Sequence, residues 1–346
     1  MNKTSLASHL DYLQIDQYLD SIFDAQSLAV AFDKGLIDYA DRVADLTMDQ
    51  VTLLLESDPE GARLILGLLV QNQVLKEQDG RYKLTPEFKD ALAFRDLMLA
   101  KLQFLSFVAN DFTGKFTQLI CNPQQFFQQS NLFLLFDYSR ALESSKENYA
   151  HTQRWVNLTT SLTKHEAPMC LQMHDFSKYH KALDYGGNSG EFALQLCRNN
   201  SDIKVTVLDL PVVCEVGQNH ISSHPEKNRI SFHPITVPEL PDLDFDVIIF
   251  KSMLHDWPEP EVDGFLDRAI EMLAPDGTLI IFERGPVEYQ RLKMHFSLIP
   301  VLLFFRSYRG PDFYRQALAA RGFNEVEVKW VDLDMPFLQL TARRRR

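Results

Sequence analysis

The stretch that decides the fold is KALDYGGNSG, residues 181–190. A short β-type run ends at Tyr185, glycines follow at positions 186, 187 and 190, and a helical pattern begins at 190. Adjacent glycines let the backbone turn tightly and let a ligand lie against it, while the next helix offers free N–H groups. A glycine turn is a weak signal by itself, because many strand-to-helix turns need one, so the rest of the chain must supply the context.

Strand and helix patterns alternate along the chain after this turn. The strand-like runs are KVTVLDL, RISFH, DVIIFK and TLIIFE, and helical patterns begin near residues 212 and 259. Short apolar runs separated by helices predict an α/β fold with a Rossmann-like, doubly wound and mostly parallel sheet. EVEVKW and FLQLTA near the end indicate two more strands, for which an antiparallel hairpin is one arrangement.

The N-terminal part of the chain has different helix and turn signals. Thr47 and Gln50 fit a capping box, and Asp58 before Pro59 fits the start of a helix with an apolar stripe. The pair Asp79-Gly80 can then turn two short strands back on each other. Helices followed by such a hairpin are typical of a winged-helix module.

The charge of the chain argues against a nucleic-acid ligand. The net charge is −12, from 35 basic and 47 acidic residues, and residues 1–95 alone hold 9 basic and 16 acidic residues. The helix expected at 59–73, which would enter a DNA groove, has Arg63 as its single basic residue. Such a surface repels phosphate groups. We therefore expect the module to serve protein contact, as the subunit interface of a homodimer.

The chain is expected to have three parts. Residues 1–95 form a winged-helix dimerisation domain, residues 96–170 a helical linker that contributes to the dimer and to a substrate pocket, and residues 171–346 a ligand-binding domain. The middle part is rich in phenylalanine, which is typical of a core between domains or subunits and also of a pocket for an apolar ligand.

No segment indicates a membrane span or a disulfide framework. The run LIPVLLFF at 298–305 is far shorter than the ~20 residues that a spanning helix needs, and the N-terminus lacks an apolar signal core. The four cysteines form no CxxC or metal-ligand cluster and are expected to be buried thiols. We therefore expect a cytoplasmic protein that binds neither a membrane nor a metal.

Ligands of an open α/β sheet bind just beyond the carboxyl ends of the strands. The first such end carries Asp184, Gly186 and Gly187. After the second strand, Asp209 lies 19 residues beyond Gly190, where an acid can accept hydrogen bonds from both ribose hydroxyls of a nucleoside cofactor. The alternative role for Asp209 is a helix cap. The dinucleotide fingerprint GxGxxG is not met, which disfavours a nicotinamide oxidoreductase.

The third strand end, in DVIIFKSMLHDWPEPEV, carries the most specific pattern. It places Lys251, His255, Asp256 and Trp257 beside the same crevice. A lone histidine is more often a structural hydrogen-bonding residue than a base. The glycine turn and Asp209 at the neighbouring strand ends favour a catalytic role for this one.

Together these residues resemble the S-adenosylmethionine-dependent O-methyltransferase family of the plant caffeate and bacterial small-molecule type. Its members join an N-terminal winged-helix dimerisation domain to a C-terminal, Rossmann-like S-adenosylmethionine domain, here residues 171–346. The resemblance covers nearly the whole chain. It rests on DYGGNSG against the family's DxGGGxG, on VLDLP against its DLP, and on LHDW, its most discriminating signature.

The resemblance implies a role for each of these residues. S-adenosylmethionine would be the cofactor, Lys251 would support its bound end, and His255 would be the catalytic base. Glu283, at the end of TLIIFE, would orient that histidine, while its alternative role is a strand-end residue paired with Arg284 or with another surface base. The other cofactor contacts implied are Asp184, Gly186, Gly187, Asp209, Leu210 and Thr236.

The acceptor that the resemblance implies is a small, aromatic metabolite with a hydroxyl group, phenolic or polyketide-like. A phenol with a pKa of ~10 stays protonated at neutral pH, whereas a histidine near ~6.5 can take its proton as the new bond forms. The protein must also align the acceptor oxygen, the methyl group and the sulfur, and exclude water. Met294, Phe296 and Trp257 would contact the acceptor, in which nitrogen could also replace oxygen.

Three positions depart from the family pattern. Asn188 replaces the third glycine of GGG, and Ile235 or Thr236 stands where the family has an acid at the adenine side. Tyr308 stands where a second glutamate often precedes Arg309. These departures leave a second hypothesis, a homologue that binds S-adenosylmethionine without methylating and serves regulation or another reaction. The intact base and its orienting acid argue against it.

Overall fold

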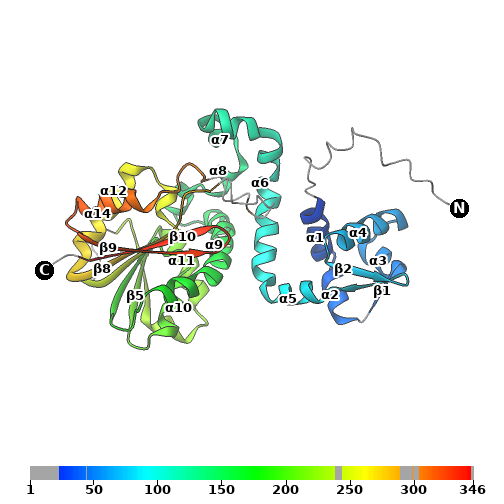
Figure 1. The fold of residues 1–346 in the computed structure, drawn as a ribbon, viewed down its shortest axis with the longest axis horizontal. Helices are drawn as coiled ribbons and strands as arrows, with labels where there is room; N and C mark the ends of the chain where they lie inside the picture. Colours follow the sequence, from blue (N-terminus) through cyan, green and yellow to red (C-terminus); the bar gives the residue numbers. More distant parts are fainter. Residues whose placement is uncertain (1–22, 44, 238–243, 289–297, 299–303, 344–346) are drawn as a thin grey trace. The chain divides into compact units, whose positions relative to one another are not determined.

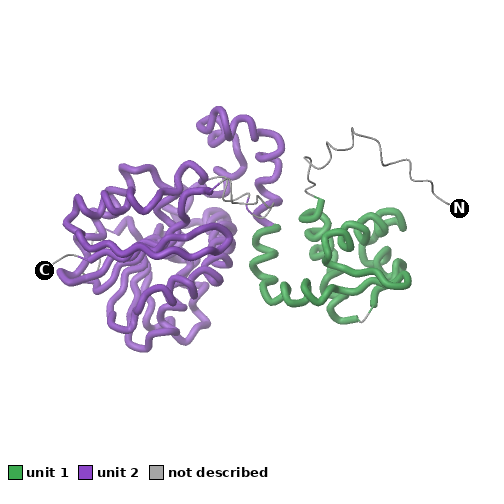
Figure 2. The backbone as a smooth tube through the Cα atoms, in the orientation of Figure 1, with its two compact units in different colours: residues 1–102 green, residues 103–346 purple. Residues whose placement is uncertain are grey.

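The computed structural model describes residues 23–43, 45–237, 244–288, 298 and 304–343. The chain forms two compact units, residues 1–102 and residues 103–346 (Figure 2), and each is described by itself. The expected division into residues 1–95, 96–170 and 171–346 stays a prediction. Within the described ranges, no helix combines the length and the apolar character needed to cross a membrane.

The first unit places helices around a small antiparallel sheet with the strand order β1-β3-β2 (Figure 1). The turn at Asp79 and Gly80, with left-handed φ values of 52° and 71°, joins β2 to β3 as predicted. The capping box also forms, because Thr47 Oγ1 accepts from the Gln50 amide over 3.3 Å and Gln50 Oε1 accepts from the Thr47 amide over 2.9 Å. The elements are α1 (Phe23–Asp33), α2 (Leu36–Arg42), β1 (Leu46–Thr47), α3 (Met48–Leu55), α4 (Pro59–Gln71), β2 (Leu75–Gln78), β3 (Arg81–Leu84) and α5 (Pro86–Ala91).

A run of helices precedes the large sheet of the second unit. One of them, α6, begins in the first unit and ends at Cys121, which is exposed, whereas the sequence predicted a buried thiol. The end of this helix is open to solvent, since the neighbouring Ile120 is also exposed. The other three cysteines are buried, and all four are free. The elements are η3 (Leu92–Phe94), α6 (Arg95–Cys121), α7 (Pro123–Gln129), α8 (Asn131–Leu135), η4 (Tyr138–Ala141) and α9 (Lys146–Met173).

The second unit is built on a seven-stranded sheet with the order β6-β5-β4-β7-β8-β10-β9 (Figure 1). The first five strands are parallel, and β10 pairs antiparallel with both β8 and β9. The predicted doubly wound sheet and its terminal hairpin are confirmed. The strands are β4 (Lys181–Tyr185), β5 (Lys204–Asp209), β6 (Ile230–Pro234), β7 (Phe245–Lys251), β8 (Leu273–Arg284), β9 (Glu325–Asp332) and β10 (Pro336–Arg343).

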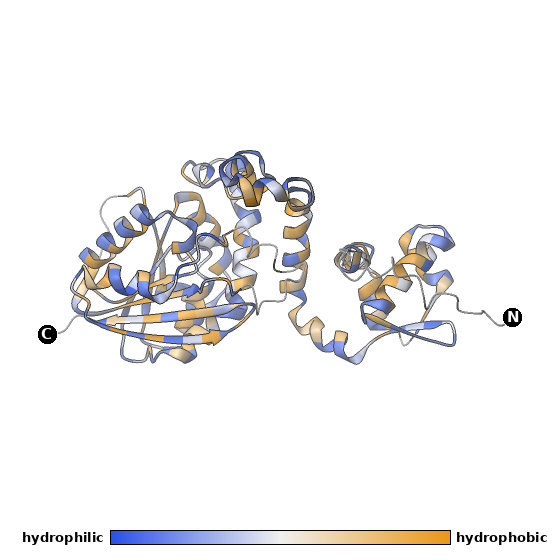
Figure 3. Ribbon diagram, turned by 45° about the horizontal axis from the view of Figure 1, so that its top comes forward, coloured by the Kyte–Doolittle hydropathy of each residue, from blue (hydrophilic) through white to orange (hydrophobic). Residues whose placement is uncertain are grey.

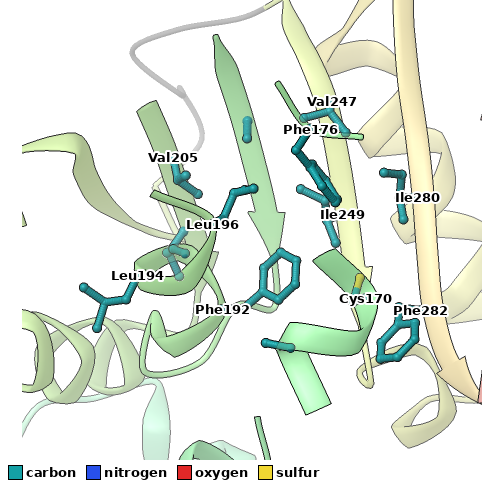
Figure 4. Packing of buried hydrophobic residues seen from close by; sticks show 14 of the residues in the cluster. Cys170, Phe176, Phe192, Leu194, Leu196, Val205, Val247, Ile249, Ile280 and Phe282 are labelled. Atoms are coloured by element: carbon teal, nitrogen blue, oxygen red, sulfur yellow. The ribbon is translucent and has the colours of Figure 1, made fainter. Parts of the chain in front are cut away.

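Two apolar layers cover this sheet. On one face, Ile249 and Phe282 pack with Cys170 of α9 and Phe192 of α10 (Figure 4). On the other face, Ile248 packs with the apolar sides of α12 and α14. Successive residues of a strand point to opposite faces, so strands covered on both sides are apolar in their middle parts, and orange segments run along the strands of the sheet between paler and blue ones (Figure 3). The helices are α10 (Glu191–Asn199), α11 (Pro211–Ile221), η5 (Pro225–Arg229), η6 (Leu254–Asp256), α12 (Glu259–Met272) and α14 (Pro311–Ala319).

The strand order creates a switch point at β4. The chain moves from β4 to β5 and β6 on one side and then crosses to β7 on the other side of β4. Connections that leave in opposite directions open a crevice beyond the carboxyl ends of these strands. The glycine turn, Asp209 and Lys251 all lie at these ends.

Candidate active site

The glycine turn after β4 requires glycine at both of its first positions. Gly186 has a left-handed φ of 71°, and a Cβ there would lie 2.5 Å from the Met253 side chain. At Gly187 a Cβ would lie 2.4 Å from the Asp184 carboxylate. Both distances are far below van der Waals contact, so any side chain would displace its neighbours. The turn therefore brings bare backbone next to Asp184.

Asn188 fills the position of the missing third glycine without breaking the turn. Its φ is 56°, in the left-handed region that asparagine tolerates better than most residues. Its amide donates to Asp209 Oδ2 over 2.8 Å. Its side-chain oxygen accepts from the Ser189 amide over 2.8 Å and from Thr159 Oγ1 over 3.2 Å. Asn188, in place of the third glycine, therefore links the glycine turn to α9 through its side-chain hydrogen bond.

Asp209 connects the end of β5 with the glycine turn. Asp209 Oδ2 accepts from the Asn188 amide, and Asp209 Oδ1 accepts from the Leu210 amide over 2.7 Å. Leu210 is the N-cap residue of α11. Burial is the main influence and raises the pKa of Asp209 to about 6, although both backbone hydrogen bonds act against it. Ile235 donates its amide to the Asp209 carbonyl over 2.8 Å and is half-buried, whereas Thr236 is exposed in the following turn.

Asp184 has a buried carboxylate that accepts no hydrogen bond from the described residues. Both of its oxygens lack a hydrogen-bond partner among the described residues, and the side chain is almost fully buried. Burial raises its pKa to about 7, the charge of Lys251 opposes that rise, and Asp209 adds to it. A buried carboxylate without a partner is costly. Beside a turn of bare backbone, it suits a cationic group of a ligand.

Lys251 lies at the end of β7 and is held by α9. Its ammonium donates to Thr163 Oγ1 over 3.1 Å and forms a buried ion pair with Glu166. Glu166 also binds the Arg284 guanidinium over 2.6 Å. Although burial acts in the opposite direction, the charges of Lys251 and Arg284 lower the pKa of Glu166 to about 2. Sequence reasoning missed Glu166, for which the polar stripe along α9 would have been the available signal.

His255 is buried and held by Glu283. In η6, His255 Nδ1 lies 2.7 Å from Glu283 Oε2, and the other carboxylate oxygen accepts from the amides of Met253 and Leu254, each over 2.7 Å. Glu283 has no exposed surface. One carboxylate therefore fixes both the imidazole ring and the backbone that carries it.

The alternative pairing of Glu283 with Arg284 is wrong. Arg284 instead contacts Glu166 and, over 3.4 Å, Asp334. Adjacent residues of a strand point to opposite faces, which explains why these two side chains at the end of β8 have different hydrogen-bond partners.

A second carboxylate faces the other ring nitrogen of His255. Asp256 Oδ1 lies 3.4 Å from His255 Nε2, and Asp256 Oδ2 accepts from the Tyr138 hydroxyl over 2.9 Å. The Tyr138 ring stacks on Trp257 at 5.9 Å between centroids. Burial lowers the pKa of His255, but the charges of Glu283 and Asp256 outweigh it, so the pKa is raised overall. Neither Tyr138 nor the orientation of Asp256 was predicted from the sequence.

Aromatic side chains surround the imidazole. The rings of Phe304 and Tyr308 each lie 5.2 Å from the His255 ring, so Tyr308 packs on the histidine where the family pattern has a glutamate. Arg309 donates to two backbone carbonyls around His255 over 2.9 and 2.6 Å and so supports that segment. Trp257 is half-buried beside it. The expected acceptor contacts Met294 and Phe296 lie outside the described residues.

Comparison with known proteins places this site in a family context. The model of the O-methyltransferase domain matches residues 122–324. The O-methyltransferase FrzF of Cladobotryum sp is 28% identical over 123 residues, which are 36% of this chain and 29% of that protein. The acetylserotonin O-methyltransferase of Macaca mulatta is 22% identical over 332 residues, 92% of this chain and 94% of that protein. The chain spans less than half the length of two other curated relatives, at 29% and 46%.

The fold has close counterparts among solved structures. The human N-acetylserotonin methyltransferase in complex with SAM has a TM-score of 0.77 at 18% identity, over 99% of both chains. This likeness identifies the fold as that of the class I methyltransferases and confirms the predicted fold class. Because the domain match runs from residue 122 to residue 324, more than half of the chain, and includes the glycine turn, Asp209, His255 and Glu283, this protein belongs to the O-methyltransferase family.

Proposed function

We propose that this protein transfers a methyl group from S-adenosylmethionine to a hydroxyl oxygen of a small aromatic metabolite, with His255 as the general base. The observation that carries the proposal is the buried pair of His255 and Glu283, 2.7 Å apart, at the same strand ends as the glycine turn. A base oriented by a buried carboxylate, next to a site for a nucleoside cofactor, suits proton removal during group transfer.

The residues at the switch point fit the cofactor. The backbone of Gly186 and Gly187 would lie along its methionine part, and the unpartnered Asp184 would receive its ammonium group. Asp209 would accept the ribose hydroxyls with the lone pairs that its two backbone donors leave. Lys251 would bind the carboxylate. Leu210 and Thr236 would border the adenosine part, and Ile235, whose amide bonds to Asp209, supports that assignment at the adenine side.

The chemistry of the step is divided between cofactor and protein. Bound S-adenosylmethionine supplies a methyl group already activated by a sulfonium. His255 Nε2 would take the proton of the acceptor hydroxyl, while Glu283 holds Nδ1–H and so selects the required tautomer. Glu283 and Asp256 would then stabilise the imidazolium that forms. The burial of His255 and Glu283 would also help to keep water away from the reacting atoms.

An apolar and flat acceptor fits the surroundings of the base. Phe304, Tyr308 and Trp257 present aromatic surfaces around His255, and such surfaces favour stacking with another aromatic ring. We propose phenolic or polyketide-like hydroxyl compounds, with Met294 and Phe296 as further contacts. Carboxylates placed near the base disfavour an anionic acceptor.

The first unit is proposed to be a winged-helix domain that forms a homodimer. Its helices and wing-like hairpin support the first part. Apolar side chains that lie open on its surface support the second, with exposed fractions of 80% for Leu53, 63% for Leu64 and 61% for Phe23.

The test is an incubation of the full chain with labelled S-adenosylmethionine and a panel of phenols, quinones and hydroxylated polyketides. Transfer of label to an oxygen of one class supports the proposal and names the acceptor. Cofactor binding without transfer to any compound would favour the alternative, a homologue that binds without methylating. A parallel fluorescence titration with NADH tests the disfavoured oxidoreductase role.

A further inference from the structure

The helix α9 carries a stripe of polar side chains along one face. This stripe contacts three segments at the edge of the sheet where the cofactor is proposed to bind: the glycine turn, the end of β7 and the end of β8. Thr159 bonds to Asn188 over 3.2 Å, and Thr160 bonds to Ser189 over 2.7 Å. Residues three or four positions apart share one face of a helix. The next positions on this face are 163 and 166, so α9 continues from the glycine turn to the ends of β7 and β8.

The last residue of this stripe, Glu166, decides where Lys251 lies. An ammonium has three N–H donors, and α9 takes two of them, through Thr163 at 3.1 Å and through the Glu166 carboxylate. The other oxygen of Glu166 binds Arg284 over 2.6 Å. All three charged side chains are more than nine-tenths buried. Glu166 is therefore held from two sides and cannot follow a movement of Lys251.

Asp184 is the competing partner for Lys251. It is buried next to the glycine turn, its charge interacts with that of Lys251, and its oxygens have no hydrogen-bond partner among the described side chains and backbone. A lysine has a flexible four-carbon stem and would move to the carboxylate that attracts it most. The pairing with Glu166 leaves Asp184 free to receive another cation.

We infer that Glu166 is a positioning residue for the amino-acid end of the cofactor: it holds Lys251 away from Asp184, so that the two remain a separated pair of opposite charges. An α-amino acid carries an ammonium and a carboxylate on one carbon, and such a pair complements it. This inference rests on the proposed function. Glu166 touches neither the cofactor nor the acceptor in this scheme and acts through Lys251.

The experiment compares two ligands that differ in the amino-acid end. S-adenosylhomocysteine carries it, and 5′-methylthioadenosine lacks it, so calorimetric titration of both separates this end from the nucleoside. In Glu166→Gln, we expect binding of S-adenosylhomocysteine to weaken at least tenfold, because Lys251 can then pair with Asp184. Binding of 5′-methylthioadenosine should stay within twofold. The matched control is Glu147→Gln, the same change on α9 at an exposed carboxylate that pairs with Arg140. This variant should bind both ligands with unchanged affinity.

Further variants keep the test decisive if Glu166→Gln folds poorly. Glu166→Asp preserves the buried charge but is too short to reach both cations, so it should show the same selective loss in smaller degree. In a double-mutant cycle, Lys251→Met should weaken binding of S-adenosylhomocysteine, and adding Glu166→Asp should weaken that binding no further, as expected for a residue that acts through the lysine.

The outcomes distinguish this inference from the proposed function. Equal weakening of both ligands in Glu166→Gln, or no weakening of either, would overturn the positioning role while leaving a methyltransferase in place. Additive losses in the double mutant would overturn it as well. If the unmodified protein bound neither ligand, the proposed function itself would fail, and the inference with it.

Discussion

At the scale of single residues, the imidazole of His255 is the group on which the proposed reaction depends. It lies between two carboxylates with different tasks. Glu283 bonds directly to Nδ1 over 2.7 Å and to two backbone amides, so it fixes the position of the ring. Asp256 lies 3.4 Å from Nε2 and is itself bound by Tyr138. Nε2 is the nitrogen left to meet an acceptor.

Replacement of His255 by alanine should separate catalysis from cofactor binding. The ring contacts the aromatic side chains of Phe304 and Tyr308 and the carboxylates of Glu283 and Asp256, and none of these four residues is proposed to hold S-adenosylmethionine. We expect kcat to fall by ~10² to 10⁴, the usual contribution of a general base, with the Kd for S-adenosylhomocysteine nearly unchanged. Steady-state kinetics and calorimetry measure the two effects, and an unchanged kcat would refute the assigned role.

The pH dependence of kcat should report the same imidazole. The neighbouring carboxylates raise the His255 pKa above its ordinary value of 6.5, and a protonated imidazole cannot accept the acceptor's proton. Activity should therefore rise with pH through a value above 6.5. Glu283→Gln removes one of the charges that raise the pKa, so the acid limb should move to lower pH while kcat falls. A limb that stays in place in this variant would contradict the assignment.

At the scale of elements, the predictable parts of the fold are those whose signals lie within a few residues. The capping box at Thr47, the turn at Asp79 and the glycines after β4 each follow from local stereochemistry. The alternation of strand and helix patterns also predicted the mostly parallel sheet, and the two strand-like runs near the end of the chain predicted its terminal hairpin. The ends of β4, β5 and β7 could be placed together because parallel strands share an edge, which is why Asp209 and Lys251 could be predicted as neighbouring candidate residues.

Contacts between segments that are distant in the sequence could not be predicted from such local patterns. Glu166 and Lys251 are separated by 85 positions, and Tyr138 and Asp256 by 118. Both depend on how the helices before the sheet pack against its edge, and no short pattern encodes that packing. The acid that holds Lys251 and the tyrosine that binds Asp256 were therefore missed, although the residues that they serve were identified.

The glycine turn gives a test of how closely the backbone must approach the cofactor. In Gly187→Ala the new Cβ would lie 2.4 Å from the Asp184 carboxylate, so that side chain must shift. We expect at least tenfold weaker binding of S-adenosylhomocysteine and a loss of ~1–3 kcal/mol in the free energy of unfolding from overpacking. Calorimetry and urea unfolding measure these changes.

The matched control is Gly264→Ala in α12. A Cβ there meets nothing within 4 Å, so this change should raise the free energy of unfolding by ~0.5–1 kcal/mol through helix propensity and leave binding unaltered. If both variants bound S-adenosylhomocysteine as the original chain does, the turn would not be the cofactor contact that we propose.

At the scale of the whole molecule, the charge and the surface of the first unit determine its proposed use. Residues 1–95 hold 16 acidic and 9 basic residues, a net negative charge that argues against a nucleic-acid partner. Its apolar side chains at Leu53 and Leu64 are largely exposed. An acidic surface with apolar positions is better suited to contact with another protein, and a second copy of this chain is the partner that we propose.

Sedimentation of the full chain should therefore show a homodimer. A double variant with Leu53→Glu and Leu64→Glu should shift the protein toward monomer, because each change places a charge in the apolar contact, and desolvating an unpaired charge costs several kcal/mol. Gln78→Glu, an exposed change on the hairpin of the same unit, is the control for added charge and should stay dimeric. A full chain that sediments as a monomer at micromolar concentration would remove the basis for a dimerisation domain, and methyl transfer would then have to proceed within a single copy.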